Sequence, residues 1–277
     1  MSKQLRIGAA IMARNANFFI PAVIAGLSWV DSIFLYDDNS TDDTVAVATH
    51  TSTVPLIIER GQDEEAAFAR GELAVRNYII NRAFEECHAD VLLLVDSDEL
   101  FSASLRAIIE DAFAQSEADG LCVSTWHLYT RSEYIHCWET AMNGISMLDP
   151  HLRVITPGRF YEPSYADGSH PCIPTTPFTH CVHGAHHFHL KYYHLSPLPN
   201  YALNFLPKYP GPVDMRPYLR TLPFPLPADV ERHLNLVLWG SQEQIETEYY
   251  RAYECVRVAQ TPEQVLVHPR DRRKPPC

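Results

Sequence analysis

An unbroken apolar run that ends in carboxylates is the feature that most constrains how this chain can fold. Residues Val91–Val95 read Val-Leu-Leu-Leu-Val, and Asp96, Ser97, Asp98 and Glu99 follow at once. A short apolar run of this kind predicts a strand that is buried on both faces, as the strands of parallel sheets are. Ligands of open α/β sheets bind beyond the carboxyl ends of the strands, where these carboxylates would lie.

The spacing of two of these aspartates indicates a cation site. Asp96 and Asp98 are two residues apart, so a fully extended strand would direct both side chains to the same side. Mg²⁺ and Mn²⁺ take carboxylate and water oxygens as ligands and usually share phosphate oxygens of a substrate. We therefore expect a metal that holds a diphosphate. Because an Asp-x-Asp pattern is short, an acidic turn without any ligand stays open as the alternative.

A second acidic strand end lies upstream. Ser32–Tyr36 reads as a strand, and the turn-forming residues Asp37–Thr44 follow it. Thr41 or Asp42 would then cap a helix that begins near Val45. A carboxylate at this place could accept hydrogen bonds from a uracil imide or from ribose hydroxyls. A turn and a helix cap without a ligand explain the composition equally well.

Strands and helices alternate through the first half of the chain, which predicts a mostly parallel sheet with right-handed crossovers. The expected strands cover residues 5–12, 32–36, 55–58, 91–95 and 121–126, and the expected helices cover 18–27, a segment from about 42, 64–87 and 104–118.

The second half is dense in prolines, histidines and aromatic residues from about 131 to 220, and its periodicity is weak. Strands are expected at 152–155 and 186–194, an irregular proline-rich wrap at 197–227, and helices at 228–239 and 242–258.

The composition limits which binding partners and which cellular compartment are expected for this chain. The 277 residues carry a formal net charge of -12, which argues against wide nucleic-acid binding and against adhesion to anionic membranes. No run of about eighteen apolar residues occurs, so no membrane span is expected. The seven cysteines form no Cys-x-x-Cys pair and suit reduced thiols. The segment before the first strand leaves no room for a signal peptide, so we expect a cytoplasmic protein.

Three stretches and one dipeptide carry a family resemblance. The stretches are Ile11–Asn15, Phe34–Thr44 and Leu94–Glu99, and the dipeptide Arg76-Asn77 lies on the helix before the acidic strand. In this order and spacing they resemble glycosyltransferase family 2, a group of nucleotide-sugar-dependent enzymes with the GT-A fold.

The resemblance covers roughly residues 5 to 130. It departs at Ala16, where many relatives carry Glu, and at Asp43, where Gly is common. Neither departure removes an expected metal ligand.

The resemblance implies a GT-A, Rossmann-like α/β fold with a mostly parallel sheet flanked by helices. Residues 1–195 would form the catalytic domain, with the nucleotide-sugar-binding part at about 1–130 and an irregular acceptor part at about 131–195. Residues 196–277 would form the proline-rich wrap and a C-terminal helical extension. The implied activity is metal-dependent, inverting transfer of a sugar from a nucleotide-diphosphate sugar, with UDP favoured, to an unknown acceptor.

By the same resemblance, the ends of the strands would form the donor site. Asp38 or Asp37 would hold the uracil or ribose, and Asp98, with Asp96, would bind Mn²⁺ or Mg²⁺ across the diphosphate. The full set expected to bind the nucleotide sugar is Ala13, Arg14, Asn15, Asp37, Asp38, Arg76, Asp96, Ser97 and Asp98.

A guanidinium would add to the binding of the phosphates. Arg14, Arg70 and Arg76 are the candidates, and Arg14 is preferred because it is close to the end of the first strand.

Histidines are dense between residues 180 and 194. GT-A enzymes often draw a further metal ligand from a histidine late in the catalytic domain, and His189-Leu190-Lys191 resembles such a segment. The resemblance makes His189 the first choice as a metal ligand, ahead of His187 and His194. Ordinary hydrogen-bonded packing is the alternative for each of them.

An inverting transferase needs a base that takes the proton of the acceptor hydroxyl, commonly a carboxylate. The candidates are Glu139, Asp149 and Glu162. Glu139 is preferred because Trp138 and Trp126 could form a wall that stacks on a sugar, although core packing is the alternative for either tryptophan.

Two other functions stay open. A degenerate GT-A module that binds carbohydrate or serves as a scaffold would lack the base and keep Asp96 and Asp98. A sugar nucleotidyltransferase would favour a Gly-rich, basic loop over a triphosphate, and the loop Arg14–Phe19 contains no glycine.

Overall fold

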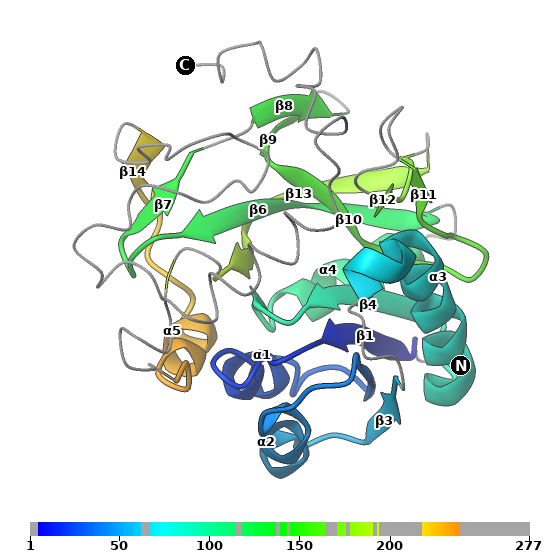
Figure 1. Ribbon diagram of the computed structural model, residues 1–277. Helices are drawn as coiled ribbons and strands as arrows, with labels where there is room; N and C mark the ends of the chain where they lie inside the picture. Colours follow the sequence, from blue (N-terminus) through cyan, green and yellow to red (C-terminus); the bar gives the residue numbers. More distant parts are fainter. Residues whose placement is uncertain are drawn as a thin grey trace, which may run out of the picture.

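The computed structural model describes residues 5–61, 67–114, 118–136, 139–142, 145–163, 171–175, 178–190, 193 and 218–238. These residues form an α/β fold around a ten-stranded sheet (Figure 1). One part of the sheet is parallel, in the order β3-β2-β1-β4. Its strands are β1 (Ile7–Ala13), β2 (Ser32–Asp37), β3 (Leu56–Arg60) and β4 (Val91–Asp96).

Beyond β4 the sheet becomes mixed. β10 (Pro150–Ile155) runs antiparallel between β4 and β6 (Gly120–Leu128), while β13 (Thr179–His189) runs parallel to β6 and antiparallel to β5 (Glu99–Phe101). The remaining strands are β7 (Glu133–Ile135), β14 (Leu219–Thr221), the pair β8 (Glu139–Met142) and β9 (Ile145–Leu148), and the pair β11 (Glu162–Pro163) and β12 (Pro171–Cys172).

The helices flank this sheet. They are α1 (Ile20–Gly26), α2 (Thr44–Thr51), α3 (Ala67–Cys87), α4 (Leu105–Ala114) and α5 (Ala228–Leu234). The predicted α/β fold is confirmed. Four of the five strands predicted from the alternation of strands and helices form the parallel part of the sheet, whereas the fifth, β6, is separated from β4 by the antiparallel strand β10. No helix in the described part of the chain is both long and apolar enough to cross a membrane.

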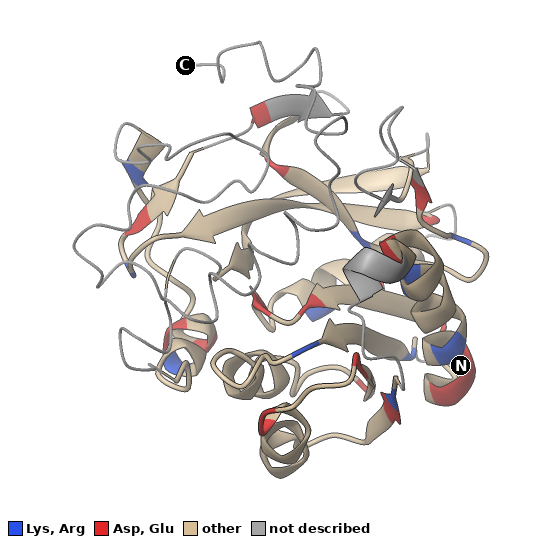
Figure 2. Cartoon of the chain, in the orientation of Figure 1, with Lys and Arg blue, Asp and Glu red and all other residues tan. Residues whose placement is uncertain are grey.

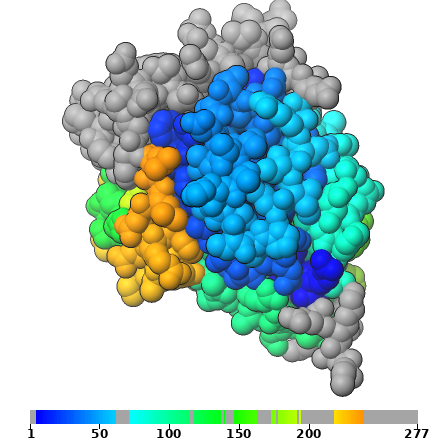
Figure 3. Space-filling view, turned by 90° about the horizontal axis from the view of Figure 1, so that it is seen from below, coloured from blue at the N-terminus to red at the C-terminus, as the bar shows by residue number. Residues whose placement is uncertain are grey.

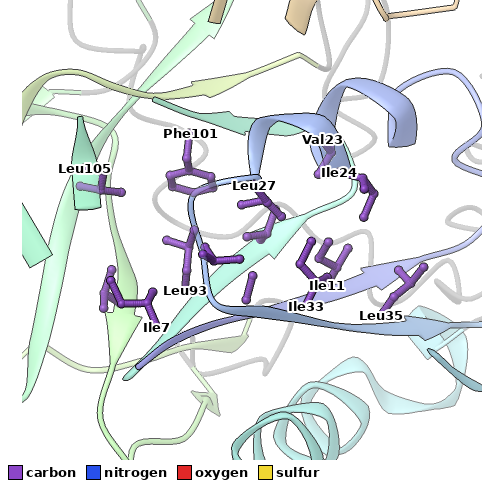
Figure 4. Packing of buried hydrophobic residues seen from close by; sticks show 14 of the residues in the cluster. Ile7, Ile11, Val23, Ile24, Leu27, Ile33, Leu35, Leu93, Phe101 and Leu105 are labelled. Carbon is purple, nitrogen blue, oxygen red and sulfur yellow. The ribbon is translucent and has the colours of Figure 1, made fainter. Parts of the chain in front are cut away.

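Alternating side chains make both faces of the parallel strands apolar. Successive residues of a strand point to opposite faces. Ile7 and Ile11 of β1 therefore pack in a cluster with α1 and α4, whereas Ala10 packs in a second cluster with α3. Figure 4 shows the first cluster, in which Ile24 of α1 and Leu93 of β4 lie on the same side of the sheet as Ile11. The buried run in β4 is thus covered on both sides, as its sequence predicts.

The second half of the chain holds more strands than its sequence predicts. The predicted strand at 186–194 begins earlier, as part of β13, and β14 lies inside the segment 197–227 that was expected to be irregular. The expected strand at 186–194 is thus confirmed in part, over residues 186–189, whereas the expectation that 197–227 is irregular throughout was wrong. Short strands interrupted by proline and histidine give little two-residue periodicity. The predicted helix at 242–258 and the predicted domain boundary near residue 195 lie outside the described residues.

Helix α5 packs against the N-terminal part of the fold. Val230 and Leu234 share an apolar cluster with Ala22 of α1. Figure 3 shows α5, in orange, against the N-terminal segments, in blue. Asp229 Oδ2 also accepts a hydrogen bond from the Ala103 N–H at 2.6 Å, just before α4 begins. A residue near the end of the described chain therefore fixes the start of a helix in the first half.

Candidate active site

Strands β1, β2 and β4 end side by side at one edge of the sheet. Met12 of β1 is in register with Asp96 of β4, and Ala13 is in register with Asp37 of β2. The segments that follow therefore leave the sheet at the same level. Acidic and basic residues are intermixed over the described elements (Figure 2), so the charge at this edge is set by individual contacts.

The loop after β1 and the turn after β2 are joined by hydrogen bonds. The Asn15 N–H donates to Ser40 Oγ at 2.9 Å, and the Thr41 N–H donates to Asn15 Oδ1 at 2.8 Å. Asn15 and Asn39 have φ angles of 49° and 58°, a left-handed conformation that Asn tolerates better than most residues. The asparagines therefore suit the tight path of both segments, and Asn15, predicted at the donor site, has a structural role as well.

The start of α2 differs by one residue from the prediction. The N-cap position is Asp43, whose side chain makes no capping hydrogen bond. Asp42 Oδ1 accepts a hydrogen bond from the Thr44 N–H at 3.0 Å instead. Asp42, one of the two predicted caps, thus contacts the first turn from just outside the helix.

Asp37 is part of the turn itself. Its side chain is fully buried, and Oδ1 accepts a hydrogen bond from the Ser40 N–H at 3.1 Å. Arg60 Nε lies 3.2 Å from Oδ2, although the pair lacks hydrogen-bond geometry. These contacts give Asp37 a role in folding the turn.

Asp38 is held by the loop after β1. Its N–H donates to Ala13 O at 2.8 Å, and its carbonyl oxygen accepts a hydrogen bond from Arg14 Nη1, also at 2.8 Å. Arg14 Nη1 lies 3.6 Å from the carboxylate oxygen Oδ2. The structure therefore brings Arg14 and Asp38, both predicted to bind the donor, into contact.

Asp96 lies between two arginines. Its Oδ1 is 2.9 Å from Arg76 Nη1, and its Oδ2 is 3.4 Å from Arg153 Nη1. Burial alone would raise the pKa of Asp96, but the charges of the two guanidinium groups outweigh burial and lower it. Asp96 is therefore ionised, and each of its oxygens already faces a cation.

The dipeptide Arg76-Asn77 also anchors a distant segment. Asn77 Oδ1 accepts a hydrogen bond from the Tyr161 N–H at 2.7 Å, and Asn77 Nδ2 donates to Tyr161 O at 2.9 Å. The Arg76 guanidinium lies over the Tyr161 ring, 5.4 Å from its centroid. The side chain of Arg70, another predicted candidate, lies outside the described part of the chain.

A buried polar layer lies beneath this edge. Glu99 accepts a hydrogen bond from Arg153 Nη2 and lies 3.1 Å from His187 Nε2. His187 is fully buried, stacks on Phe101 and bonds through Nδ1 to Thr125 Oγ1 at 3.0 Å. Burial keeps the pKa of His187 well below its usual value, and the Arg153 charge adds to this effect. His187, the second choice as metal ligand, is therefore a neutral side chain packed inside the fold.

Asp98 and His189 face each other at the open side of the site. Asp98 Oδ2 is 3.1 Å from His189 Nε2, and the two side chains are 25% and 19% exposed. The Leu190 N–H also donates to the carbonyl oxygen of Asp98 at 2.7 Å. These contacts bring together the two residues that the sequence resemblance names as metal ligands. His194, the third choice, lies outside the described residues.

The hydrogen bonds continue from His189 into the sheet. His189 Nδ1 lies 2.8 Å from His127 Nδ1, and His127 Nε2 lies 2.6 Å from Asp149 Oδ2. His151 Nε2 reaches the same Asp149 oxygen at 3.3 Å. Burial alone would raise the pKa of Asp149, but its contacts with His151 and His127 lower it well below its usual range. Asp149 is therefore an ionised carboxylate at the far end of the chain of contacts.

The Asp98–His189 pair fits a divalent cation. Carboxylate oxygens and imidazole nitrogens are both ligands for Mn²⁺ in proteins. Neighbouring ligands of an octahedral cation with bonds of about 2.1 Å lie about 3 Å apart, and Asp98 Oδ2 and His189 Nε2 are separated by 3.1 Å. Within the described residues, no group of three or more His, Cys, Asp or Glu side chains is arranged to hold a metal. A cation here would therefore complete its shell with water and with phosphate oxygens of a donor.

The three candidate bases occupy different surroundings. Glu139 is exposed in β8, in register with Leu148, the residue before Asp149. Hydrogen bonds from Ser146 and His136 lower the pKa of Glu139, so it is ionised. Asp149 is bound to histidines, as described above, and Glu162 is an exposed residue of β11. Trp138, expected to form a sugar-stacking wall, lies outside the described residues.

Trp126 packs in the core. It is 3% exposed, and its Nε1–H donates to Gly184 O at 2.7 Å. Of the two readings of this residue, the structure supports core packing over sugar stacking.

Two residues of the site escape prediction from the sequence. Arg153 and His127 contact Asp96 and His189, but no motif includes them. Arg153 could have been suspected as a lone charge inside the apolar strand Leu152–Ile155, because a buried arginine needs acidic partners.

Neither a scan against protein-family models nor a search of the curated proteins gives a match. Among solved structures, the chain is similar to residues 1–349 of S. aureus TarS at 12% identity, over 69% of this chain and 63% of that chain, with a TM-score of 0.47. The UDP complex of the same TarS segment is similar at 18% identity, over 45% of this chain and 36% of that chain, with a TM-score of 0.38.

A third structure is glucosyl-3-phosphoglycerate synthase from Mycobacterium tuberculosis in complex with Mn²⁺, UDP and glucosyl-3-phosphoglycerate. It is similar at 19% identity, over 45% of this chain and 44% of that chain, with a TM-score of 0.33. The chain thus spans less than two thirds of the length of each of these structures.

Proposed function

We propose that this chain is a metal-dependent glycosyltransferase that transfers a sugar from a nucleotide-diphosphate sugar, with UDP as the favoured nucleotide. The observation that carries the proposal is the Asp98–His189 pair, 3.1 Å apart at the edge where β1, β2 and β4 end. An open cation site at the carboxyl end of a parallel sheet is suited to a diphosphate, because phosphate oxygens can complete the metal shell.

Asp98 and His189 would hold Mn²⁺ or Mg²⁺. A divalent cation bound there supplies charge that offsets the negative charge building up on the departing diphosphate. Asp96, which faces Arg76 and Arg153, is proposed to contact the ribose or a metal-bound water and not to be the main metal ligand. Ser97 links the two aspartates and is proposed to contact the donor through its backbone.

Asp38 and Arg14 would bind the other parts of the donor. Asp38 is proposed to accept hydrogen bonds from the uracil imide or the ribose, and its contact with Arg14 orients it. Arg14, whose side chain is 29% exposed, is proposed to reach the phosphates. Ala13 and Asn15 would line the donor site between Asp38 and Arg14.

Glu139 is the proposed base for an inverting displacement. It is exposed and ionised, as a group must be to take a proton from an acceptor hydroxyl. Asp149 is a weaker candidate because its carboxylate is already bound to two histidines. Glu162, an exposed residue of β11, is proposed last. The acceptor itself is left unassigned.

A thermal-shift titration tests the donor site. The melting temperature is followed with UDP, GDP and CMP, each with and without Mn²⁺, because a ligand that binds only the folded state raises it by mass action. Stabilisation by UDP that requires Mn²⁺, and that is lost in Asp98→Ala, supports the proposal. Asp43→Ala is the matched control, since Asp43 is an exposed aspartate with no capping hydrogen bond.

The same titration, extended to nucleoside triphosphates with sugar phosphates, distinguishes the alternatives. No shift with any nucleotide would overturn the transferase and favour a binding or scaffold module. Stabilisation by a nucleoside triphosphate plus a sugar phosphate, but not by UDP, would favour a sugar nucleotidyltransferase.

A further inference from the structure

Two histidines connect the proposed cation site to a carboxylate inside the fold. The contacts run from Asp98 Oδ2 to His189 Nε2 at 3.1 Å, from His189 Nδ1 to His127 Nδ1 at 2.8 Å, and from His127 Nε2 to Asp149 Oδ2 at 2.6 Å. Both nitrogens of both rings are therefore engaged. None of the sequence motifs includes His127, and Asp149 appears among them only as a candidate base.

The backbone aligns this chain of contacts. His189 of β13 and His127 of β6 are register partners in the parallel ladder. Asp149 lies in the turn between β9 and β10 with a φ of 38°, a left-handed conformation that costs free energy in most residues. The inner part of this chain of contacts is mostly enclosed, because the side chains of His127 and Asp149 are 9% and 24% exposed.

Resting on the cation site proposed above, we infer that His127 and Asp149 are positioning residues that hold His189 as a metal ligand through Nε2. When Asp149 is ionised and His127 is neutral, the proton of His127 lies on Nε2, where it is donated to Asp149, and His127 Nδ1 is an acceptor. His189 then carries its proton on Nδ1 and donates to His127. The lone pair on His189 Nε2 is left facing the Asp98 carboxylate.

That arrangement requires a positive charge between Asp98 and His189. A nitrogen lone pair and a carboxylate oxygen at 3.1 Å repel each other unless a proton or a metal cation lies between them. Metal-bound histidines commonly donate their other ring N–H to a carboxylate or carbonyl, which fixes the tautomer and the ring orientation. Here a second histidine is inserted between the ligand and the carboxylate.

Neighbouring histidines do not share this arrangement. His183 bonds to Ser124 Oγ at 2.9 Å, and His186 bonds to Ser104 Oγ at 3.0 Å. Both hydroxyls can donate or accept, so neither fixes a tautomer. His189 differs from these two histidines of the same strand because its Nδ1 contacts His127, whose other ring nitrogen faces the Asp149 carboxylate.

Mn²⁺ affinity, measured from the electron paramagnetic resonance signal of the free ion, tests the inference on the full chain. Asp149→Asn keeps the size and tolerates the left-handed backbone but removes the charge, and His127→Phe keeps a ring but removes both nitrogens. We expect each to weaken Mn²⁺ binding by about 10- to 100-fold. His183→Phe, an exposed change on the same strand, should leave the affinity within about twofold of the wild type.

The variants also separate the two proposals. If Asp98→Ala leaves Mn²⁺ affinity unchanged, the proposed cation site is wrong, and the inference fails with it. If Asp98→Ala weakens binding while Asp149→Asn and His127→Phe bind Mn²⁺ like the wild type, the site stands and the inference alone is overturned.

A measurement on the unaltered protein guards against variants that do not fold. Long-range ¹H–¹⁵N spectra of histidine-labelled protein with Mg²⁺ report which ring nitrogen carries the proton. A proton on Nδ1 of His189 and on Nε2 of His127 supports the inference, and a proton on Nε2 of His189 in the Mg²⁺-saturated protein overturns it. Simple packing of the rings would not fix these tautomers.

Discussion

Arg153 and Glu99 are 54 positions apart in the chain, yet they form an ion pair inside the sheet, with side chains that are 7% and 2% exposed. The same arginine lies 3.4 Å from Asp96. One guanidinium therefore offsets two of the three carboxylates at the end of β4, those of Asp96 and Glu99. The third carboxylate, that of Asp98, faces His189 at 3.1 Å. This separation explains how a cluster of acidic residues can be both a folded part of the sheet and an open ligand site.

Replacing Arg153 should destabilise the fold strongly. Arg153→Met removes the charge but fills the space, and it leaves Glu99 buried without its cation. Loss of one partner of a buried ion pair costs about 3–5 kcal/mol, so we expect a decrease of this size in the free energy of unfolding, measured with urea at pH 7. Arg82→Met, at a surface ion-pair network on α3, is the control. An equal effect of the two substitutions would contradict the buried network.

The neutral state of His187 should make stability depend on pH. An unfolded histidine titrates near pH 6.5, whereas burial keeps the folded pKa of His187 well below that value. As pH falls below about 6.5, the unfolded state takes up a proton that the folded state does not. The free energy of unfolding should then fall by up to about 1.4 kcal/mol per pH unit.

His187→Phe isolates this effect. Phenylalanine can keep the stacking on Phe101, whose ring lies 4.3 Å from that of His187. The variant should lose less stability than the wild type between pH 7.5 and 5.5, as measured by urea unfolding at both values. Parallel pH profiles would contradict the prediction, because they would mean that His187 has the same pKa in the folded and unfolded states.

Asp229 should stabilise α4 although it belongs to α5. Its Oδ2 accepts hydrogen bonds from the Ala103 N–H at 2.6 Å and from Ser102 Oγ at 3.2 Å, directly before Leu105 begins the helix. Removing a side-chain cap costs about 1 kcal/mol, so Asp229→Ala should lower the melting temperature by several degrees. Glu231→Ala, also in the first turn of α5, is the matched control. If both substitutions have the same effect, the contact with α4 contributes nothing.

The parallel strands could be predicted because each is encoded locally. The run Val91–Val95 is buried on both faces, and its apolar residues predict β4 to within a residue of its observed end. β1 and β2 are likewise found close to their predicted positions. The residues of each of these strands are enough to predict it, because a strand between two layers of helices must be apolar throughout.

The network around the site could not be predicted in the same way. His127 meets His189 through the register of β6 and β13, and Arg153 meets Glu99 across β10 and β5. Such contacts depend on how distant strands pair, which no local pattern specifies. The sequence resemblance names Asp98 and His189 individually, but the support around them becomes visible only when the sheet is assembled.

The two halves of the proposed donor site should respond to substitution independently. Asp38 lies at the end of β2, and its carboxylate is proposed to accept a hydrogen bond from uracil, whereas Asp98 is proposed to bind the cation. Hydrogen bonds to charged groups contribute about 1.5–3 kcal/mol, so Asp38→Asn should weaken UDP binding by about 10- to 100-fold. The affinity of the Asp38→Asn variant for Mn²⁺ alone should stay within about twofold of that of the wild type, because Asp38 is not a proposed metal ligand.

Calorimetric titration with UDP in the presence of Mn²⁺, together with Mn²⁺ titration alone, measures both quantities. Asp43→Asn, in the same turn but exposed, serves as the control. Unchanged UDP affinity in Asp38→Asn would remove Asp38 from the nucleotide site. A parallel loss of Mn²⁺ affinity would instead mean that the turn after β2 and the edge of β4 behave as one unit. Independent effects would fit the structure, in which Asp38 is held by Arg14 and Asp98 faces His189.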